Sequence, residues 1–188
     1  MNPMSIRSER DVVLEHALRD EANLDIALKI GAAYDELCRR VVAQFLAAIE
    51  HKLSPMLGRE WKFTTCRDFH KLAERWVDLV VIEYLSHPGQ FRIHVVGDEY
   101  LKVVWLGVRA TEAPELREKV KLAINRDIAN GKIGDPSFWW CDIQKAYSNW
   151  QSEEVLLLLY RMDDALEYFV STLKRLAETI QIALTPAA

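Results

Sequence analysis

The stretch that most constrains the fold is FRIHVVGDEYLKVVWLGVR, which occupies residues 91–109. Its apolar and polar residues alternate on both sides of Gly97 and Asp98, as they do in half-buried β-strands. Glycine is the residue that a type II′ turn requires at its first central position. The pattern therefore predicts a β-hairpin over residues 91–109, in which Gly97 and Asp98 form the turn and Val96 lies opposite Glu99.

This register divides the side chains of the hairpin between two faces. One face is apolar and is predicted to belong to the core: Phe91, Ile93, Val95, Tyr100, Val104, Leu106 and Val108. The other face mixes charged and apolar side chains: Arg92, His94, Val96, Leu101, Val103 and Trp105. A face that only meets water is seldom half apolar. Either a helix covers it, which the several predicted helices favour, or it is an exposed patch for a partner, with Trp105 and Leu101 as anchors.

A second aromatic stretch, FWWCDI, covers residues 138–143 and is predicted to be a strand. Alternation gives it one wholly apolar set of side chains, which we expect in the core: Trp139, Cys141 and Ile143. The other set is mixed, like the second face of the hairpin: Phe138, Trp140 and Asp142. Phe138 and Trp140 are therefore further candidates for a partner-binding surface.

Helical spacing dominates the rest of the chain. Apolar residues recur at intervals of three and four over residues 23–53, which predicts a long amphipathic helix. After Leu37 the interval is repeatedly four, and this drift favours a packed core helix over an extended coiled coil. Capping residues and spacing predict further helices: a short one after Ser8, one from Asp68 to Tyr84, one between Pro114 and Gly131, and a C-terminal region from Ser152 that Asp163–Asp164 can divide in two.

The alternating stretch at residues 61–66 adds one more predicted strand. No repeat or linker divides the chain, so we expect a single α+β domain over residues 1–188. It is predicted to be mostly helical and packed on a small antiparallel sheet that contains the hairpin. Residues 1–7 and 185–188 are expected to be flexible ends.

The charge balance limits the classes of partner. The 188 residues include 28 acidic and 24 basic side chains, well mixed, with a net charge of −4. Broad binding to DNA or RNA needs a basic face that displaces counterions, so we do not expect it. The longest apolar run, VLLLLY at residues 155–160, is far shorter than the roughly 20 residues that cross a bilayer. No membrane association is therefore expected.

The cysteines indicate a compartment. Cys38, Cys66 and Cys141 are odd in number and far apart. The N-terminal stretch MNPMSIRSERDVV lacks the apolar segment of a signal peptide. Together these features favour the reducing cytoplasm.

No pattern in the sequence predicts a catalytic, metal or cofactor site. A nuclease of the PD-(D/E)XK kind needs an acid and a lysine two residues apart, but Glu99 and Lys102 are three apart and would lie on opposite strand faces. Cys66 and His70 form one C-x-x-x-H pair, and the second pair that a structural zinc site usually has is missing. G-x-S-x-G, P-loop and G-x-G-x-x-G motifs are also missing. We therefore expect no cofactor.

These observations favour a non-enzymatic, cytosolic protein-binding module, such as an inhibitor, an immunity protein, an adaptor or an assembly factor. The alternative is a metal-dependent hydrolase or nuclease-like enzyme with a site near the hairpin end, residues 94–102. The residues that would form that site are His94, Asp98, Glu99 and Lys102. A third hypothesis is self-association through residues 23–53 or 153–184, because both segments have wide apolar stripes.

Overall fold

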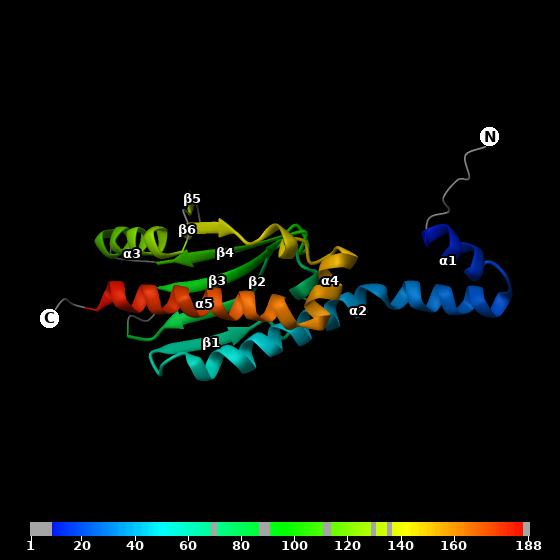
Figure 1. Ribbon diagram of the computed structural model, residues 1–188, viewed down its shortest axis with the longest axis horizontal. Helices are drawn as coiled ribbons and strands as arrows, with labels where there is room; N and C mark the ends of the chain where they lie inside the picture. Colours follow the sequence, from blue (N-terminus) through cyan, green and yellow to red (C-terminus); the bar gives the residue numbers. More distant parts are fainter. Residues whose placement is uncertain are drawn as a thin grey trace. The chain divides into compact units, whose positions relative to one another are not determined.

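The computed structural model describes residues 9–68, 71–86, 91–110, 114–128, 131–134 and 137–185. The chain divides into two compact units, Met1–Cys38 and Arg39–Ala188. The helices are α1 (Glu9–Ala17), α2 (Glu21–Leu53), α3 (Pro114–Asp127), α4 (Glu153–Arg161) and α5 (Asp163–Leu184) (Figure 1). The predicted flexible ends lie outside the described residues, apart from Thr185.

The second unit contains a six-stranded antiparallel sheet in the order β1-β2-β3-β4-β6-β5. Its strands are β1 (Trp61–Thr65), β2 (Val77–Tyr84), β3 (Arg92–Asp98), β4 (Val103–Arg109), β5 (Lys132–Gly134) and β6 (Ser137–Asp142). The predicted α+β class is confirmed, and so are the strands predicted at residues 61–66 and 138–143. The short edge strand β5 was not predicted, because three residues carry too little alternation.

The helix predicted from Asp68 to Tyr84 is wrong, because Lys71–Ala73 forms only a short 3-10 helix and Val77–Tyr84 forms strand β2. A β-bulge interrupts the pairing of β2 with β3 between Asp78 and Val80. At a bulge two successive residues oppose one on the partner strand, and here both Leu79 and Val80 are buried. The adjacent buried pair imitates the spacing of an amphipathic helix, although β2 lies between two strands that supply its hydrogen bonds. Residues 69–70 of the predicted helix lie outside the described part of the chain.

The hairpin over residues 91–109 is present, but its predicted turn is wrong. Val96 lies opposite Trp105, and residues 99–102 form the turn between the paired residues Asp98 and Val103. Gly97 is inside the strand, where a Cβ atom would lie 2.3 Å from Cδ2 of Leu101. The glycine therefore makes room for the turn to fold over the strand.

The true register differs from the predicted one by an even number of residues, so the strand side chains keep their predicted faces. Ile93 and Val95 are buried with Leu106 and Val108, as expected of the core face. Tyr100 was also assigned to that face, and this is wrong. It lies in the turn, with 52% of its surface exposed.

Helices α3 and α5 and the second half of α2 pack on this core face. Thr65 of β1 donates a hydrogen bond to Glu50 of α2 over 2.7 Å, and Trp139 of β6 donates one to Asn125 of α3 over 2.9 Å. Helix α5 contacts both α3 and β3, and Figure 1 shows it running across the sheet. The ring of Phe45 in α2 meets Phe169 of α5 edge-on at 5.5 Å. The hydrophobic core of the second unit therefore lies between these helices and one sheet face.

The long helix predicted over residues 23–53 is confirmed as α2. Its predicted apolar stripe is buried only in the second half, where the buried side chains are Val42, Phe45, Leu46, Ile49 and Leu53. Residues four apart advance about 40° beyond a full helical turn, so a stripe with repeated intervals of four winds around the helix. For this reason Ile26, Ile30 and Leu37 do not share a face with the buried residues. All three are exposed, but so are Leu24 and Leu28 on the side of the buried residues, so burial along α2 changes near the boundary between the two units rather than from face to face.

The predicted division of the C-terminal helical region is confirmed. Ser152 caps α4 by accepting a hydrogen bond from the Val155 amide, and Met162 separates α4 from α5 in a left-handed conformation with φ of 65°. Among the described helices, none has both the length and the apolar content needed to cross a membrane.

Candidate functional site

The second sheet face is the one opposite the packed helices. Strand alternation and register assign these side chains to it: Asp78, Val81, Glu83, Arg92, His94, Val96, Val103, Trp105, Arg109, Trp140 and Asp142. On β2 the two faces differ in burial. Val77, Ile82 and Tyr84 on the core face are buried, while Asp78 and Glu83 on the second face are only half-buried. The second face is therefore neither wholly covered nor freely exposed.

A row of three tryptophans crosses this face. Trp105 on β4 lies at its centre, with ring centroids 5.3 Å from Trp76 and 5.9 Å from Trp140. Trp105 is 8% exposed, whereas Trp76 is 40% exposed and Trp140 is half-buried. Lys132 of β5 extends the row, since its Nζ lies 4.5 Å from the ring centroid of Trp140. We call Trp76, Trp105, Trp140 and Lys132 the tryptophan row.

Beside the tryptophan row lies a polar cluster of Asp78, His94 and Arg109. Asp78 Oδ1 is 3.1 Å from His94 Nδ1 and 3.7 Å from Arg109 Nη2. Burial opposes ionisation of Asp78, but the hydrogen bond from His94 and the nearby guanidinium outweigh it and lower the pKa of this carboxyl. Asp78 is thus a carboxylate that accepts from the Nδ1–H of His94.

Two nitrogen atoms of the polar cluster are buried without a hydrogen-bond partner. They are Nε2 of His94, which is 2% exposed as a residue, and Nε of Arg109. Native structures leave few buried polar atoms unpaired, because each costs about 1–3 kcal/mol. The two unpaired nitrogens lower the stability of the fold, so a stabilising role does not by itself account for the polar cluster.

Two ion pairs join further charged side chains on the second face. Arg92 contacts Glu83 over 2.8 Å, and Lys132 contacts Asp142 over 2.9 Å. Both pairs join neighbouring strands, so each positive charge has a negative one beside it. The face carries mixed charge rather than a basic track.

The structure brings together some of the residues predicted to bind a partner. Trp105 and Trp140 are neighbours in the tryptophan row, while Arg92 and Val103 are exposed on the same face. Leu101 is buried in the hairpin turn, where its carbonyl accepts a hydrogen bond from the Trp150 amide over 2.9 Å.

Phe138 lies at the far end of the sheet from the hairpin turn. Its half-buried ring meets Phe91 edge-on, with the centroids 6.2 Å apart.

Two residues of the site, Trp76 and Lys132, were not indicated by the sequence. Trp76 was assigned to the predicted helix, and Lys132 belongs to the unpredicted strand β5. Their side chains can be recognised only after the strands are paired.

The residues of the alternative enzyme site are not gathered in one place. Asp98 ends β3 and Glu99 and Lys102 lie in the turn, whereas His94 contacts Asp78 further along the sheet. Within the described ranges, no three His, Cys, Asp or Glu side chains lie together as metal ligands would. His70, the expected partner of Cys66 in a zinc site, lies outside the described residues.

The thiols of Cys66 and Cys141 do not have the environment of activated nucleophiles. Burial raises the pKa of Cys141 to about 11, and the adjacent Asp142 contributes in the same direction. Burial also raises the pKa of Cys66. A nucleophilic cysteine needs a lowered pKa, because the thiolate is the reactive form.

Comparison with known proteins adds no further constraint on this site. No protein-family model, curated protein or solved structure matches the chain. The second face, with its tryptophan row and polar cluster, is the candidate functional site on geometry alone.

Proposed function

We propose that this chain is a non-enzymatic, cytosolic protein-binding module that holds its partner on the second sheet face. The observation that carries the proposal is the tryptophan row, which lies on the face opposite the packed helices. Tryptophan is enriched among the residues that dominate binding energy at protein interfaces. In this arrangement the buried ring of Trp105 packs against Trp76 and Trp140. Those two rings are more exposed than Trp105 and are the anchors of the proposed surface.

The charges on the second face favour a protein partner over a nucleic acid. Arg92 and Lys132 each contact an acidic side chain of a neighbouring strand. A surface for a nucleic-acid backbone would instead present unpaired positive charges along one track. Alternating acidic and basic groups around an aromatic centre correspond to the polar rim of a protein interface.

The polar cluster supports the same proposal. Arg109 keeps part of its side chain exposed, and its Nη2 lies 3.7 Å from the Asp78 carboxylate that also accepts from buried His94. The partly exposed Arg109 side chain carries donors for a carbonyl or carboxylate oxygen of a bound protein, and charge-assisted hydrogen bonds are the stronger ones. The cluster would then fix the orientation of a partner that the tryptophans anchor.

The cytosolic assignment within this proposal is supported by the cysteines. All three are free thiols, and Cys66 and Cys141 are partly buried with raised pKa values. Thiols of this kind persist in a reducing compartment. Fractionation of cells that contain the native protein would test the assignment, and recovery outside the cytosol would contradict it.

Substitution of the anchors tests the proposed binding function. The wild-type chain is used to capture its partner from cells that contain it, and the affinity of the purified partner is then measured by calorimetry. We expect Trp140→Ala and Val103→Asp each to weaken binding about tenfold or more, because both alter the second face. Val103 is exposed at the start of β4, so this variant introduces a charge without emptying the core.

The matched control is Tyr160→Ala, which removes an exposed aromatic side chain from α4. It should leave the affinity unchanged. The melting temperature of every variant is measured alongside, since Trp140 contacts Trp105 and its loss could loosen the sheet. Wild-type affinity in both face variants, or equal losses in the control, would overturn the proposed function.

A further inference from the structure

A second exposed surface lies in the first unit, far along the chain from the tryptophan row. The large hydrophobic side chains exposed between residues 12 and 37 are Val12, Val13, Leu14, Leu18, Leu24, Ile26, Leu28, Ile30, Tyr34 and Leu37. Monomeric proteins expose single large apolar side chains, but a concentration of them in one segment points to a contact with another protein. Nothing in the proposed role of the second sheet face uses it.

The spacing on α2 shows which kind of partner this surface fits. Ile26, Ile30, Ala33 and Leu37 follow one another at intervals of four, three and four, which is the interval pattern of a coiled-coil seam. All four side chains are exposed. We call them the α2 seam. The pattern is interrupted at Arg40, so the seam is confined to the part of α2 that belongs to the first unit.

We infer that two copies of this chain associate through the α2 seam, with the two helices antiparallel. Antiparallel packing places Ile26 opposite Leu37 of the second copy and Ile30 opposite Ala33. Each layer then repeats by two-fold symmetry, so one surface serves both copies. The layer of Ile30 and Ala33 combines a large with a small side chain, which lets the helices approach without a void.

The flanking residues favour the same orientation. In the antiparallel register Lys29 faces Glu36 of the second copy, and the symmetric contact repeats on the other side of the pair. Lys29 already contacts Asp25 over 2.7 Å, so it can bridge two carboxylates in the dimer. On the opposite flank Tyr34 faces Ala27, again a large residue against a small one. In the antiparallel arrangement the two helices are therefore complementary in both charge and side-chain volume.

Parallel packing of the same seam fits less well. It would stack Ala33 on Ala33, leaving a gap in the middle of the interface, and it would set Lys29 beside Tyr34 instead of Glu36. Neither the charges nor the volumes are complementary in that arrangement. Because the seam has only four layers, we expect a weak and reversible dimer rather than an obligate one.

Sedimentation of the full chain over a concentration series tests the inference. We expect the average mass to rise from monomer toward dimer with concentration. Ile30→Asp should raise the dissociation constant about tenfold or more, because it puts a charge into both symmetric layers. Ile30 is 62% exposed in the single chain, so this change should leave the melting temperature unaltered. Ile182→Asp, at an exposed position on α5, is the matched control and should dimerise like the wild type.

Charge exchange tests the orientation. Lys29→Glu and Glu36→Lys should each weaken the dimer several-fold, because like charges then face each other across the seam, and the double variant should restore it. Circular dichroism checks that α2 remains helical in each variant. A monomer at every concentration overturns the inference, as does a lower melting temperature for Ile30→Asp without any change in mass. Single charge variants that dimerise normally overturn the antiparallel arrangement.

Discussion

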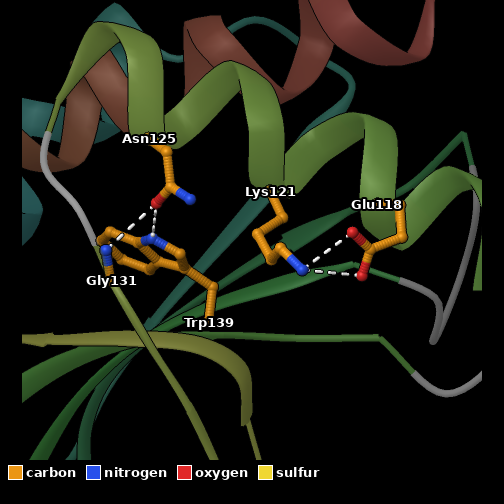
Figure 2. Close-up of polar contacts among 5 residues, drawn as sticks. All are labelled: Glu118, Lys121, Asn125, Gly131 and Trp139. Atoms are coloured by element: carbon orange, nitrogen blue, oxygen red, sulfur yellow. Dashed lines mark hydrogen bonds and ion pairs between the residues drawn. The ribbon is translucent and has the colours of Figure 1, made fainter.

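At the scale of single residues, the two adjacent tryptophans of β6 have different environments. Trp139 is fully buried on the core face, where its Nε1 donates to Asn125 Oδ1 over 2.9 Å (Figure 2). The Gly131 amide donates to the same oxygen over 3.0 Å, and a Cβ on that glycine would lie 2.0 Å from Trp139 Nε1. Trp140 points to the other face and contacts Lys132. Alternation along the strand thus separates a structural tryptophan from a candidate binding residue.

Asn125 is predicted to be the most sensitive polar position of α3. Asn125→Ala should lower the free energy of unfolding by about 1–3 kcal/mol, because it leaves two donors, one of them on buried Trp139, without an acceptor. Urea denaturation measures the change. The control is Glu118→Ala on the same helix, where a side chain that is 65% exposed contacts Lys121 over 2.7 Å. That variant should cost no more than about 0.5 kcal/mol, and equal effects of the two would contradict the prediction.

At the scale of elements, the hairpin turn holds an unusual conformation. Glu99, Tyr100 and Leu101 have φ values of 48°, 61° and 72°, which glycine adopts far more easily than other residues. The turn nevertheless has tertiary contacts, because the Tyr100 amide donates to the Arg75 carbonyl and the Leu101 carbonyl accepts from the Trp150 amide. The surrounding structure therefore imposes a conformation for which these residue types have no local preference.

Relief of this strain should stabilise the fold. Glu99→Gly is expected to raise the free energy of unfolding by about 0.5–1 kcal/mol, since the left-handed conformation costs glycine little while the added freedom of the unfolded chain offsets part of the gain. Glu99→Ala removes the side chain but keeps the Cβ, so it should bring no such gain. Thermal and urea unfolding of both variants measure the difference. Two variants of equal stability would show that the backbone at this position is not strained.

At the scale of the whole molecule, the buried core and the exposed α2 seam belong to different units. The buried hydrophobic residues among the described positions begin at Val42 and continue to Ala183, within the second unit. The α2 seam lies in the first unit, at residues 26–37. Stability of the sheet domain and self-association should therefore be separable.

Removal of residues 1–38 tests this separation. We expect residues 39–188 to unfold cooperatively, with a melting temperature within about 5 °C of the full chain, because no described core residue is lost. We also expect the shortened chain to stay monomeric over the concentration range in which the full chain dimerises. Calorimetry and sedimentation measure the two properties. Loss of the cooperative transition would show that the first unit contributes to the core.

Several elements could be predicted from the sequence because their signals are local. Residue spacing predicts the long helix α2 and the hairpin strands, and the Ser152 side chain, which can cap a helix, predicts where α4 begins. The second face of the hairpin could also be foreseen, since alternation is preserved when the register moves by an even number of residues. The protein-binding function stays a prediction that the proposed experiments address.

The sequence by itself determined the α+β class, most helix and strand types and the mixed character of the second face, because periodicity depends only on neighbouring residues. Only the tertiary structure decided that β2 is a strand, that residues 99–102 form the turn and that Trp76, Trp105 and Trp140 meet. Each of these features depends on residues far apart in the chain, whose pairing and burial outweigh local preference. The tryptophan row, on which the proposed function rests, is therefore a product of strand pairing.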